Sequence, residues 1–263
     1  MRDIVKPEDE LIVIDGLSKD GTDQIVKNFN DIISKYISQP DINIYHACNK
    51  GMLISKGRYI KILNDDDIYY QRAMVDSVNV MDINEEIDIL ICGGTKQRGN
   101  NIWEVYIPPG IKWCHKVGDL FKYSSSGQGM LIRHDALAKI GLFDASLQVA
   151  GDSEFLARAV FKGAKVKFCR INSYHHKVYD HSTTIANEKL FNKTQVMIKK
   201  KYIIEKRQKI NPVLILKQRI LKRIPHSINN ILKFIYRIFY GSKYLNSSKI
   251  KTSSETIWDG GLS

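Results

Sequence analysis

The sequence lacks the features that mark several common protein classes. Its four cysteines are widely spaced and form no CxxC pair, which argues against a zinc ribbon and against a small disulfide-stapled fold. No apolar run approaches the ~18 residues that a membrane-spanning helix needs, and the N-terminus is too charged for a signal peptide. The sequence therefore predicts a globular chain in a reducing compartment, without a transmembrane helix.

The 263 residues carry a formal charge of +12, and the excess of basic residues is confined to one end. Residues 1–187 hold 23 basic and 24 acidic side chains, whereas residues 188–251 hold 17 basic and 2 acidic side chains. A nearly neutral body with a basic appendage differs from a uniformly basic nucleic-acid binder. We therefore expect one domain over 1–187, a basic helical extension over 188–263, and no nucleic-acid partner.

Short apolar runs rich in β-branched residues alternate with helical patterns, which predicts an α/β fold with a largely parallel sheet. A helix capped by Asp20 or Thr22 is expected to run on to Ile33, because apolar residues recur at helical spacing there. The segment 94–127 is irregular and reads as loop and edge strand. The other expected strands are 11–14, 42–45, 59–63, 88–92, 129–133 and 166–171, and the other expected helices are 49–55, 134–140 and 153–162.

Three adjacent carboxylates, Asp65, Asp66 and Asp67, follow the predicted strand 59–63. Ligands of open α/β sheets bind beyond the carboxyl ends of the strands. Adjacent carboxylates repel one another, and a divalent cation with a preference for oxygen ligands relieves that repulsion. A solvated acidic turn is the alternative. Asp15 closes another strand and Asp20 follows it, and for both of these residues helix capping or turn formation also stays open.

Four segments, in order over residues 10–185, resemble motifs of the family 2 glycosyltransferases, which have the GT-A fold. Residues 13–22 resemble VIDGgStDGT, and residues 57–67 resemble GeYIxfLNsDD. Residues 141–155 resemble the later FDe…aaDyeF segment, and residues 38–51 resemble the SEpDxGIYDAMNKG segment of colanic-acid and O-antigen type members. Each motif alone is modest, but the four together are a specific signal.

The resemblance implies a GT-A fold (Rossmann-like, with helices flanking a mostly parallel sheet) and transfer from a nucleotide-diphosphate sugar, with UDP as the expected nucleotide. It implies that Asp15 contacts the nucleobase, that Asp66 lies near the ribose and sugar, and that Asp67 coordinates Mn²⁺ or Mg²⁺. It further implies a lipid-linked or polysaccharide acceptor in surface-polysaccharide biosynthesis. The residues expected to bind the donor are Asp15, Asp20, Asn49, Lys50, Asp65 and Asp66.

Asp152 is implied by the same resemblance to be the catalytic base of an inverting reaction. A carboxylate opposite the leaving group can accept the proton of the acceptor hydroxyl, while a bound metal neutralises charge on the departing diphosphate. The alternative is that Asp152 caps the predicted helix 153–162. It could serve both roles.

Two departures from the family pattern stand out. The family normally opens with a further strand, ending in a TYN-like motif, and a helix before the 13–22 segment, and here Met1 comes too soon for them. We therefore expect a truncated or misassigned start and an unstable or inactive chain. His46 stands where the pattern has aspartate. Both departures favour the alternative function, a non-catalytic remnant that at most binds nucleotide.

Three histidines and two tryptophans leave their roles open. His175, His176 and His181 follow the last predicted strand, where a polar loop is favoured and His176 or His181 is a candidate metal ligand. Trp103 and Trp113 fall in the variable segment 94–127, where packing and stacking on a sugar are both open.

The C-terminal extension has the pattern of an amphipathic basic helix over residues 224–239. Isoleucine, leucine and phenylalanine share one face of that helix, and lysine and arginine share the other. Such a helix suits an anionic membrane surface, where each basic residue adds roughly 1 kcal/mol. We expect the protein to be cytoplasmic and peripheral at the inner face of the membrane. The alternative is a helical hairpin packed on the catalytic domain.

Overall fold

A computed structural model describes residues 4–104, 112–121, 127–179 and 182–204 of the chain. All of them belong to the first of two units, which ends at Lys206. The sequence had placed the end of the catalytic domain at residue 187. The expected amphipathic helix 224–239 and the rest of the tail lie outside the described residues.

The described strands form two sheets. The strands β1 (Leu11–Asp15) and β2 (Ile33–Ser38) pair in parallel as a two-stranded sheet. The larger sheet has the order β3-β8-β5-β9-β4, with β6 added on β5 and β7 added on β9. Its strands are β3 (Tyr59–Ile60), β4 (Asp67–Tyr69), β5 (Ile89–Arg98), β6 (Asn101–Glu104), β7 (Lys112–Cys114), β8 (Met130–Arg133) and β9 (Val166–Lys177).

The α/β class is confirmed, but the expectation of a mostly parallel sheet is wrong for the larger sheet. Only β5 and β9 pair in parallel there among the described strands. The sequence pattern missed two antiparallel insertions. The strand β5 turns directly into β6 through Gly99 and Asn100, with Gly99 at a φ of 57°, and β8 enters antiparallel between β3 and β5.

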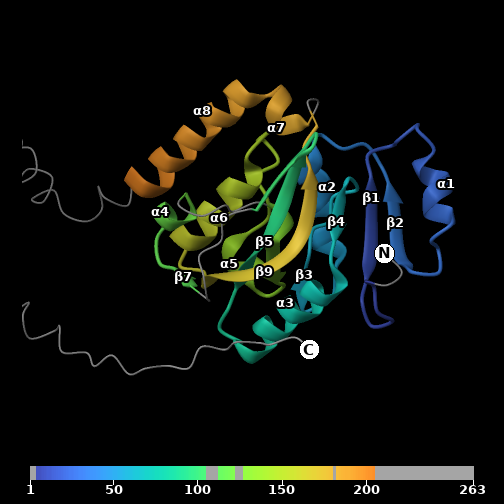
Figure 1. Cartoon of the computed structure of the whole chain (residues 1–263), viewed down its shortest axis with the longest axis horizontal. Helices are drawn as coiled ribbons and strands as arrows, with labels where there is room; N and C mark the ends of the chain where they lie inside the picture. Colours follow the sequence, from blue (N-terminus) through green and yellow to red (C-terminus); the bar gives the residue numbers. More distant parts are fainter. Residues whose placement is uncertain (1–3, 105–111, 122–126, 180–181, 205–263) are drawn as a thin grey trace, which may run out of the picture. The chain divides into compact units, whose positions relative to one another are not determined.

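Helices cover both faces of the larger sheet (Figure 1). The main core lies on the face covered by α6 and contains Phe155 and Phe168, while a smaller core lies under α3 and contains Met81 and Leu90. All four cysteines are free thiols. The helices are α1 (Thr22–Lys27), α2 (Ile44–Ile54), α3 (Gln71–Ile83), α4 (Val117–Leu120), α5 (Ala136–Ile140), α6 (Gly151–Phe161), α7 (Thr183–Ala186) and α8 (Glu188–Lys199), with the short turns η1 (Gly127–Gly129) and η2 (Lys200–Ile204).

Two predictions about the N-terminal third are wrong. The helix expected to reach Ile33 ends at Lys27, because Ile33 instead pairs with Leu11 and begins β2. The strand expected at 42–45 is the start of α2. Asn43 decides this locally, since its side-chain oxygen accepts hydrogen bonds from the backbone N–H groups of Tyr45 and His46 and so caps the helix.

The strand β9 is longer than the sequence predicted. It continues six residues beyond Ile171, to Lys177. This extension places His175 and His176 within a strand rather than in a polar loop. The expected strand 59–63 is shorter, since β3 ends at Ile60, and Asp67 begins β4 instead of lying in a loop.

The first part of the basic extension packs on the domain. Ile198 of α8 and Tyr202 of η2 are buried in the main core. The Tyr202 hydroxyl donates a hydrogen bond to the buried carboxylate of Glu154, which also binds Arg158. Residues 188–204 therefore pack on the domain, and the membrane association expected of the extension stays a prediction. No helix among the described residues is long and apolar enough to cross a membrane.

Candidate active site at the sheet surface

Four side chains form a row across the larger sheet, one from each of four neighbouring strands. Asp67 of β4 lies opposite His176 of β9, and His176 lies opposite Lys96 of β5. Lys96 in turn lies opposite Trp103 of β6. Since residues directly opposite one another share a face of the sheet, all four side chains project from the same face.

Asp67 and His176 form the centre of a group that could hold a metal ion. The Asp67 side chain is fully buried, and one of its oxygens lies 2.5 Å from Nδ1 of His176. Its other oxygen accepts a hydrogen bond of 3.0 Å from the side chain of Asn64. Ligand atoms of Asp66, Asp67 and His176 all lie within 4.8 Å of one another. Two carboxylates and one imidazole fit a divalent cation such as Mn²⁺.

The neighbouring acidic residues differ in their surroundings. Asp66 is exposed as a residue, yet partial burial of its carboxyl raises its pKa, and the charges of Asp67 and Asp65 raise the pKa further. Such repulsion is what a bound cation would relieve. Asp65 is exposed and lies outside the group of candidate ligands.

Asp152 lies in the first turn of α6, but it is not the cap of that helix. The helix begins at Gly151, and Ala150, with a φ of 59°, occupies the cap position. The Asp152 carboxylate accepts hydrogen bonds from the backbone N–H groups of Gly127, at 3.1 Å, and Ser153, at 2.8 Å. Burial raises the pKa of Asp152, and this effect outweighs the two hydrogen bonds and the charge of Lys96. A carboxylate with a raised pKa suits proton transfer.

Two lysines next to these carboxylates were missed from the sequence. Burial lowers the pKa of Lys96, while the charges of Asp152 and Asp67 oppose that change. Burial also lowers the pKa of Lys61 to about 8, and its ammonium donates a hydrogen bond to the backbone oxygen of Gln128. The sequence held a signal for Lys61, because it is the one charged residue in the apolar run 59–63. Lys96 gave no signal, because the segment 94–127 had no clear periodicity.

Asp15 and Asp20 lie at the carboxyl end of β1 and in the loop that follows. The buried Asp15 carboxylate accepts hydrogen bonds from the Ser38 hydroxyl, at 2.6 Å, and from the Ser18 N–H, and these bonds lower its pKa. The exposed Asp20 carboxylate accepts bonds from the hydroxyl and N–H of Thr22, which likewise lower its pKa. Both residues therefore have the turn-forming role that was left open. Their contact with a donor stays a prediction.

Asn49 and Lys50 of α2 have structural partners. The Asn49 amide exchanges two hydrogen bonds of 2.9 Å with the backbone of Phe143. The Lys50 ammonium lies 2.9 Å from a carboxylate oxygen of Asp41 and donates a hydrogen bond to the Pro40 carbonyl. The predicted donor contacts of these two residues are untested. His46, the departure from the family pattern, lies 3.0 Å from the same Asp41 oxygen.

The other histidines and tryptophans that the sequence left open differ in their surroundings. Both ring nitrogens of His175 are engaged, by Thr95 at 2.8 Å and Gln97 at 3.0 Å, and His181 lies outside the described residues. Trp113 packs against the smaller core with the Lys167 ammonium over its ring. Trp103 is 44% exposed.

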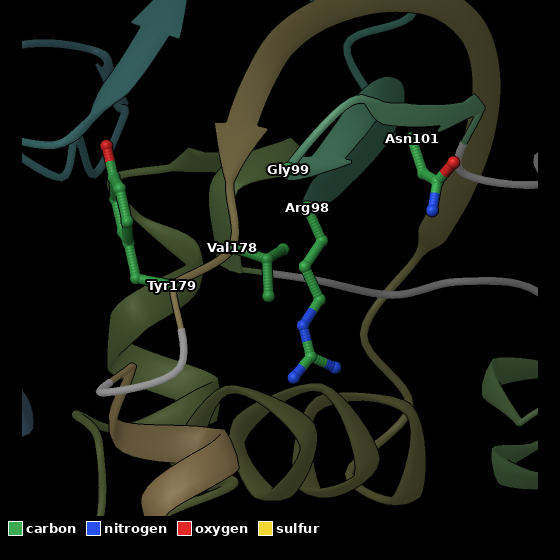
Figure 2. A pocket seen from close by; sticks show the side chains of 5 residues that line it. All are labelled: Arg98, Gly99, Asn101, Val178 and Tyr179. Carbon is green, nitrogen blue, oxygen red and sulfur yellow. The ribbon is translucent and has the colours of Figure 1, made fainter.

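A surface hollow lies just beyond the row, where the β5–β6 turn meets the end of β9. Arg98, Gly99, Asn101, Val178 and Tyr179 line it. Figure 2 shows the Arg98 and Val178 side chains side by side, with Tyr179 on one side of them and Asn101 on the other. The hollow begins two residues past Lys96 and His176 along their strands, so it adjoins the row but does not contain the carboxylates.

The family of the chain follows from a match over more than half of its length. A family model described as glycosyl transferase family 2 matches residues 2–140. The chain belongs to glycosyl transferase family 2. The matched residues include Asp15, Asp67 and Lys96, whereas Asp152 and His176 lie beyond them.

Similar proteins agree with this assignment. An uncharacterized glycosyltransferase of Rickettsia prowazekii (strain Madrid E) is 28% identical over 184 residues, which are 68% of this chain and 54% of that protein. An uncharacterized glycosyltransferase of Rickettsia felis is 26% identical over 152 residues, which are 54% of this chain and 25% of that protein. The chain thus spans about half, or less, of the length of these relatives.

Solved structures confirm the fold. Residues 1–349 of TarS from S. aureus, in complex with UDP-GlcNAc, match with a TM-score of 0.56 at 16% identity, over 66% of this chain and 51% of that one. The same TarS segment in complex with UDP matches with a TM-score of 0.54 at 18% identity, over 65% and 52% of the two chains. The chain therefore has the GT-A fold of this family.

Proposed function

We propose that the chain is an inverting glycosyltransferase that moves a sugar from a UDP-sugar to an acceptor hydroxyl. The observation that supports this most strongly is the placement of Asp67 and His176. These residues are 109 positions apart in the sequence, and the pairing of β4 with β9 brings them together beside Asp66. A group of two carboxylates and one imidazole is suited to hold a cation at the diphosphate of a donor.

In this proposal Asp67, Asp66 and His176 hold a divalent cation. The cation would neutralise charge on the departing diphosphate. Asp152 accepts the proton of the acceptor hydroxyl as that oxygen attacks the anomeric carbon. The N–H groups of Gly127 and Ser153 hold the Asp152 carboxylate in place before and after the transfer.

The proposed nucleotide and acceptor rest on the similar solved structures and on the sequence. TarS was solved with UDP and with UDP-GlcNAc, which supports UDP as the nucleotide carrier of this chain. The resemblance of residues 38–51 to colanic-acid and O-antigen type enzymes supports a lipid-linked or polysaccharide acceptor in surface-polysaccharide biosynthesis. The basic residues after 187 support attachment to an anionic membrane surface from the cytoplasmic side.

The alternative of a non-catalytic remnant is not favoured. A remnant has no need to keep a buried carboxylate such as Asp152, whose desolvation costs stability. It also has no need for Asp67 and His176 to meet across two strands.

The direct test is release of UDP from a panel of UDP-sugars in the presence of Mn²⁺. We expect the wild-type chain to release UDP, slowly with water as acceptor. Asp67→Asn and Asp152→Asn should each reduce the rate by about 100-fold or more, since general-base catalysis alone contributes ~10²–10⁴-fold. Asp135→Asn is the matched control, because the Asp135 side chain is 98% exposed. No release by the folded wild type, or equal rates in all four proteins, would contradict the proposal.

A further inference from the structure

Lys96 is the charged residue of the row that belongs neither to the proposed metal group nor to the proposed base. It lies on β5, one strand away from His176 and two strands away from Asp67. Neighbouring strands are about 4.8 Å apart, so the Cα atoms of Lys96 and Asp67 are separated by roughly 10 Å. The His176 side chain stands between them on the same face, so an anionic group that binds at Asp67 and His176 would lie within reach of the Lys96 side chain.

The Lys96 ammonium is half-buried and lacks a partner of its own. Within the described residues it forms no hydrogen bond and no ion pair, and only longer-range attraction to Asp152 and Asp67 is present. Partial burial of a cation without a partner is costly. An anion bound in front of the ammonium would remove that cost.

The position of Lys96 also fits the bond that the proposed reaction breaks. Next to Lys96 in the row lies the group of Asp67 and His176, which would hold the diphosphate end of the donor. The charge of Asp152, which would receive the proton of the acceptor, also acts on Lys96. In an inverting displacement the leaving oxygen and the base lie on opposite sides of the anomeric carbon, so a cation attracted by both groups is suited to the charge on the departing oxygen.

We propose that the Lys96 ammonium binds the diphosphate of the donor and stabilises it as it departs. This inference rests on the proposed function. In the step, the bond between the anomeric carbon and the β-phosphate oxygen breaks, and its electron pair stays on that oxygen. The acceptor oxygen forms the new bond to the carbon, and its proton passes to Asp152. Lys96 keeps its protons throughout and acts by charge and hydrogen bonding.

The test compares three ligands that differ only in phosphate: uridine, UMP and UDP, each titrated in the presence of Mn²⁺. Lys96→Met keeps the length of the side chain and removes the charge. We expect it to weaken UDP binding about 10-fold or more, because it removes a charge-assisted hydrogen bond to the diphosphate. Binding of uridine should stay within 2-fold of the wild type, and Lys96→Arg should recover most of the UDP affinity.

Lys177→Met is the matched control. Lys177 follows His176 on β9 and is exposed, and it lies opposite Gln97, one residue past the row. This variant removes the same charge from the opposite face of the sheet, and its UDP affinity should stay within 2-fold of the wild type. Thermal melts of each variant show whether the fold is intact.

The outcomes separate this inference from the proposed function. If the wild type binds UDP and Lys96→Met binds it equally well, the inference is wrong and the proposed function stands. If Lys96→Met weakens uridine as much as UDP, its effect is structural and the inference is also wrong. If the folded wild type binds no UDP, the proposed function fails and this inference fails with it.

Discussion

Two glycines in the same turn should respond differently to substitution by alanine, although they are only two residues apart. Gly127 and Gly129 begin and end η1, the turn that presents the Gly127 N–H to Asp152. Neither has a positive φ, so alanine fits the backbone conformation at both positions. The space around them differs. A Cβ at Gly129 would lie 2.3 Å from the carbonyl oxygen of Cys92, whereas a Cβ at Gly127 meets nothing closer than 3.6 Å.

The expected loss of stability follows from which part of the backbone the added methyl group displaces. The Cys92 carbonyl belongs to the centre of β5, so Gly129→Ala displaces either that strand or the turn by about 1 Å. Overpacking costs typically ~1–3 kcal/mol, and we expect the upper end because the obstacle is backbone rather than a side chain. In a domain of this size ~3 kcal/mol lowers Tm by about 6–12 °C. Gly127→Ala should leave Tm unchanged or raise it slightly, since removal of a glycine restricts the unfolded chain by ~0.4–1 kcal/mol.

Thermal unfolding followed by circular dichroism measures both effects. The rate of UDP release should also fall in Gly129→Ala, because the turn that holds the Asp152 carboxylate moves. Equal Tm values for the two variants would refute the steric reasoning. So would a Gly129→Ala protein that melts within 2 °C of the wild type.

Two further predictions concern Tyr202 and Asp152. Tyr202→Phe removes the hydroxyl that binds the buried Glu154 carboxylate. It should therefore lower the free energy of unfolding by ~1.5–3 kcal/mol and lower Tm by about 3–12 °C. Substitution of the exposed Tyr70 by phenylalanine is the control, and equal Tm values for the two variants would show that this bond does not hold η2. Asp152 works as a base only when ionised, and burial raises its pKa, so kcat/KM should fall as the pH drops through a value above the ordinary ~3.9 for aspartate. An acid limb at or below that value would contradict the assignment of Asp152.

The parts of the site that the sequence predicted are those that local motifs specify. Asp66, Asp67 and Asp152 each lie in a short segment with a recognisable pattern. The structure places Asp66 and Asp67 in a group that could hold a metal ion and gives Asp152 a raised pKa, while the roles of all three stay predictions. The α/β class also followed from local pattern, because alternating β-branched runs and helical spacing are short-range signals.

The parts that local motifs did not specify depend on strand register. His176 was one of two candidate metal ligands in an expected polar loop, and it meets Asp67 only because β9 runs on to Lys177 and pairs with β4. Lys96 lies opposite His176 only after irregularities in the pairing of β5 with β9 between Cys92 and Thr95. Register across such irregularities is set by tertiary packing, and no local periodicity carries it.

The start of α2 was missed for a different reason. Residues 42–45 alternate in polarity like a strand, and β-branched isoleucines strengthen that pattern. The Asn43 side chain outweighs this preference by capping the helix and by binding the carbonyl groups of Ala145 and Leu147. The second pair of contacts is made with residues more than 100 positions away, so a local pattern does not contain it.

Calorimetric titration of UDP, with and without Mn²⁺, tests the central claim most directly. The wild type and Asp67→Asn are compared, with Asp135→Asn as the control. The account predicts that Mn²⁺ tightens UDP binding about 10-fold or more in the wild type and in the control, and that Asp67→Asn loses this gain. UDP binding that is indifferent to Mn²⁺, or that survives unchanged in Asp67→Asn, would contradict the assignment of a metal-assisted donor site to Asp66, Asp67 and His176.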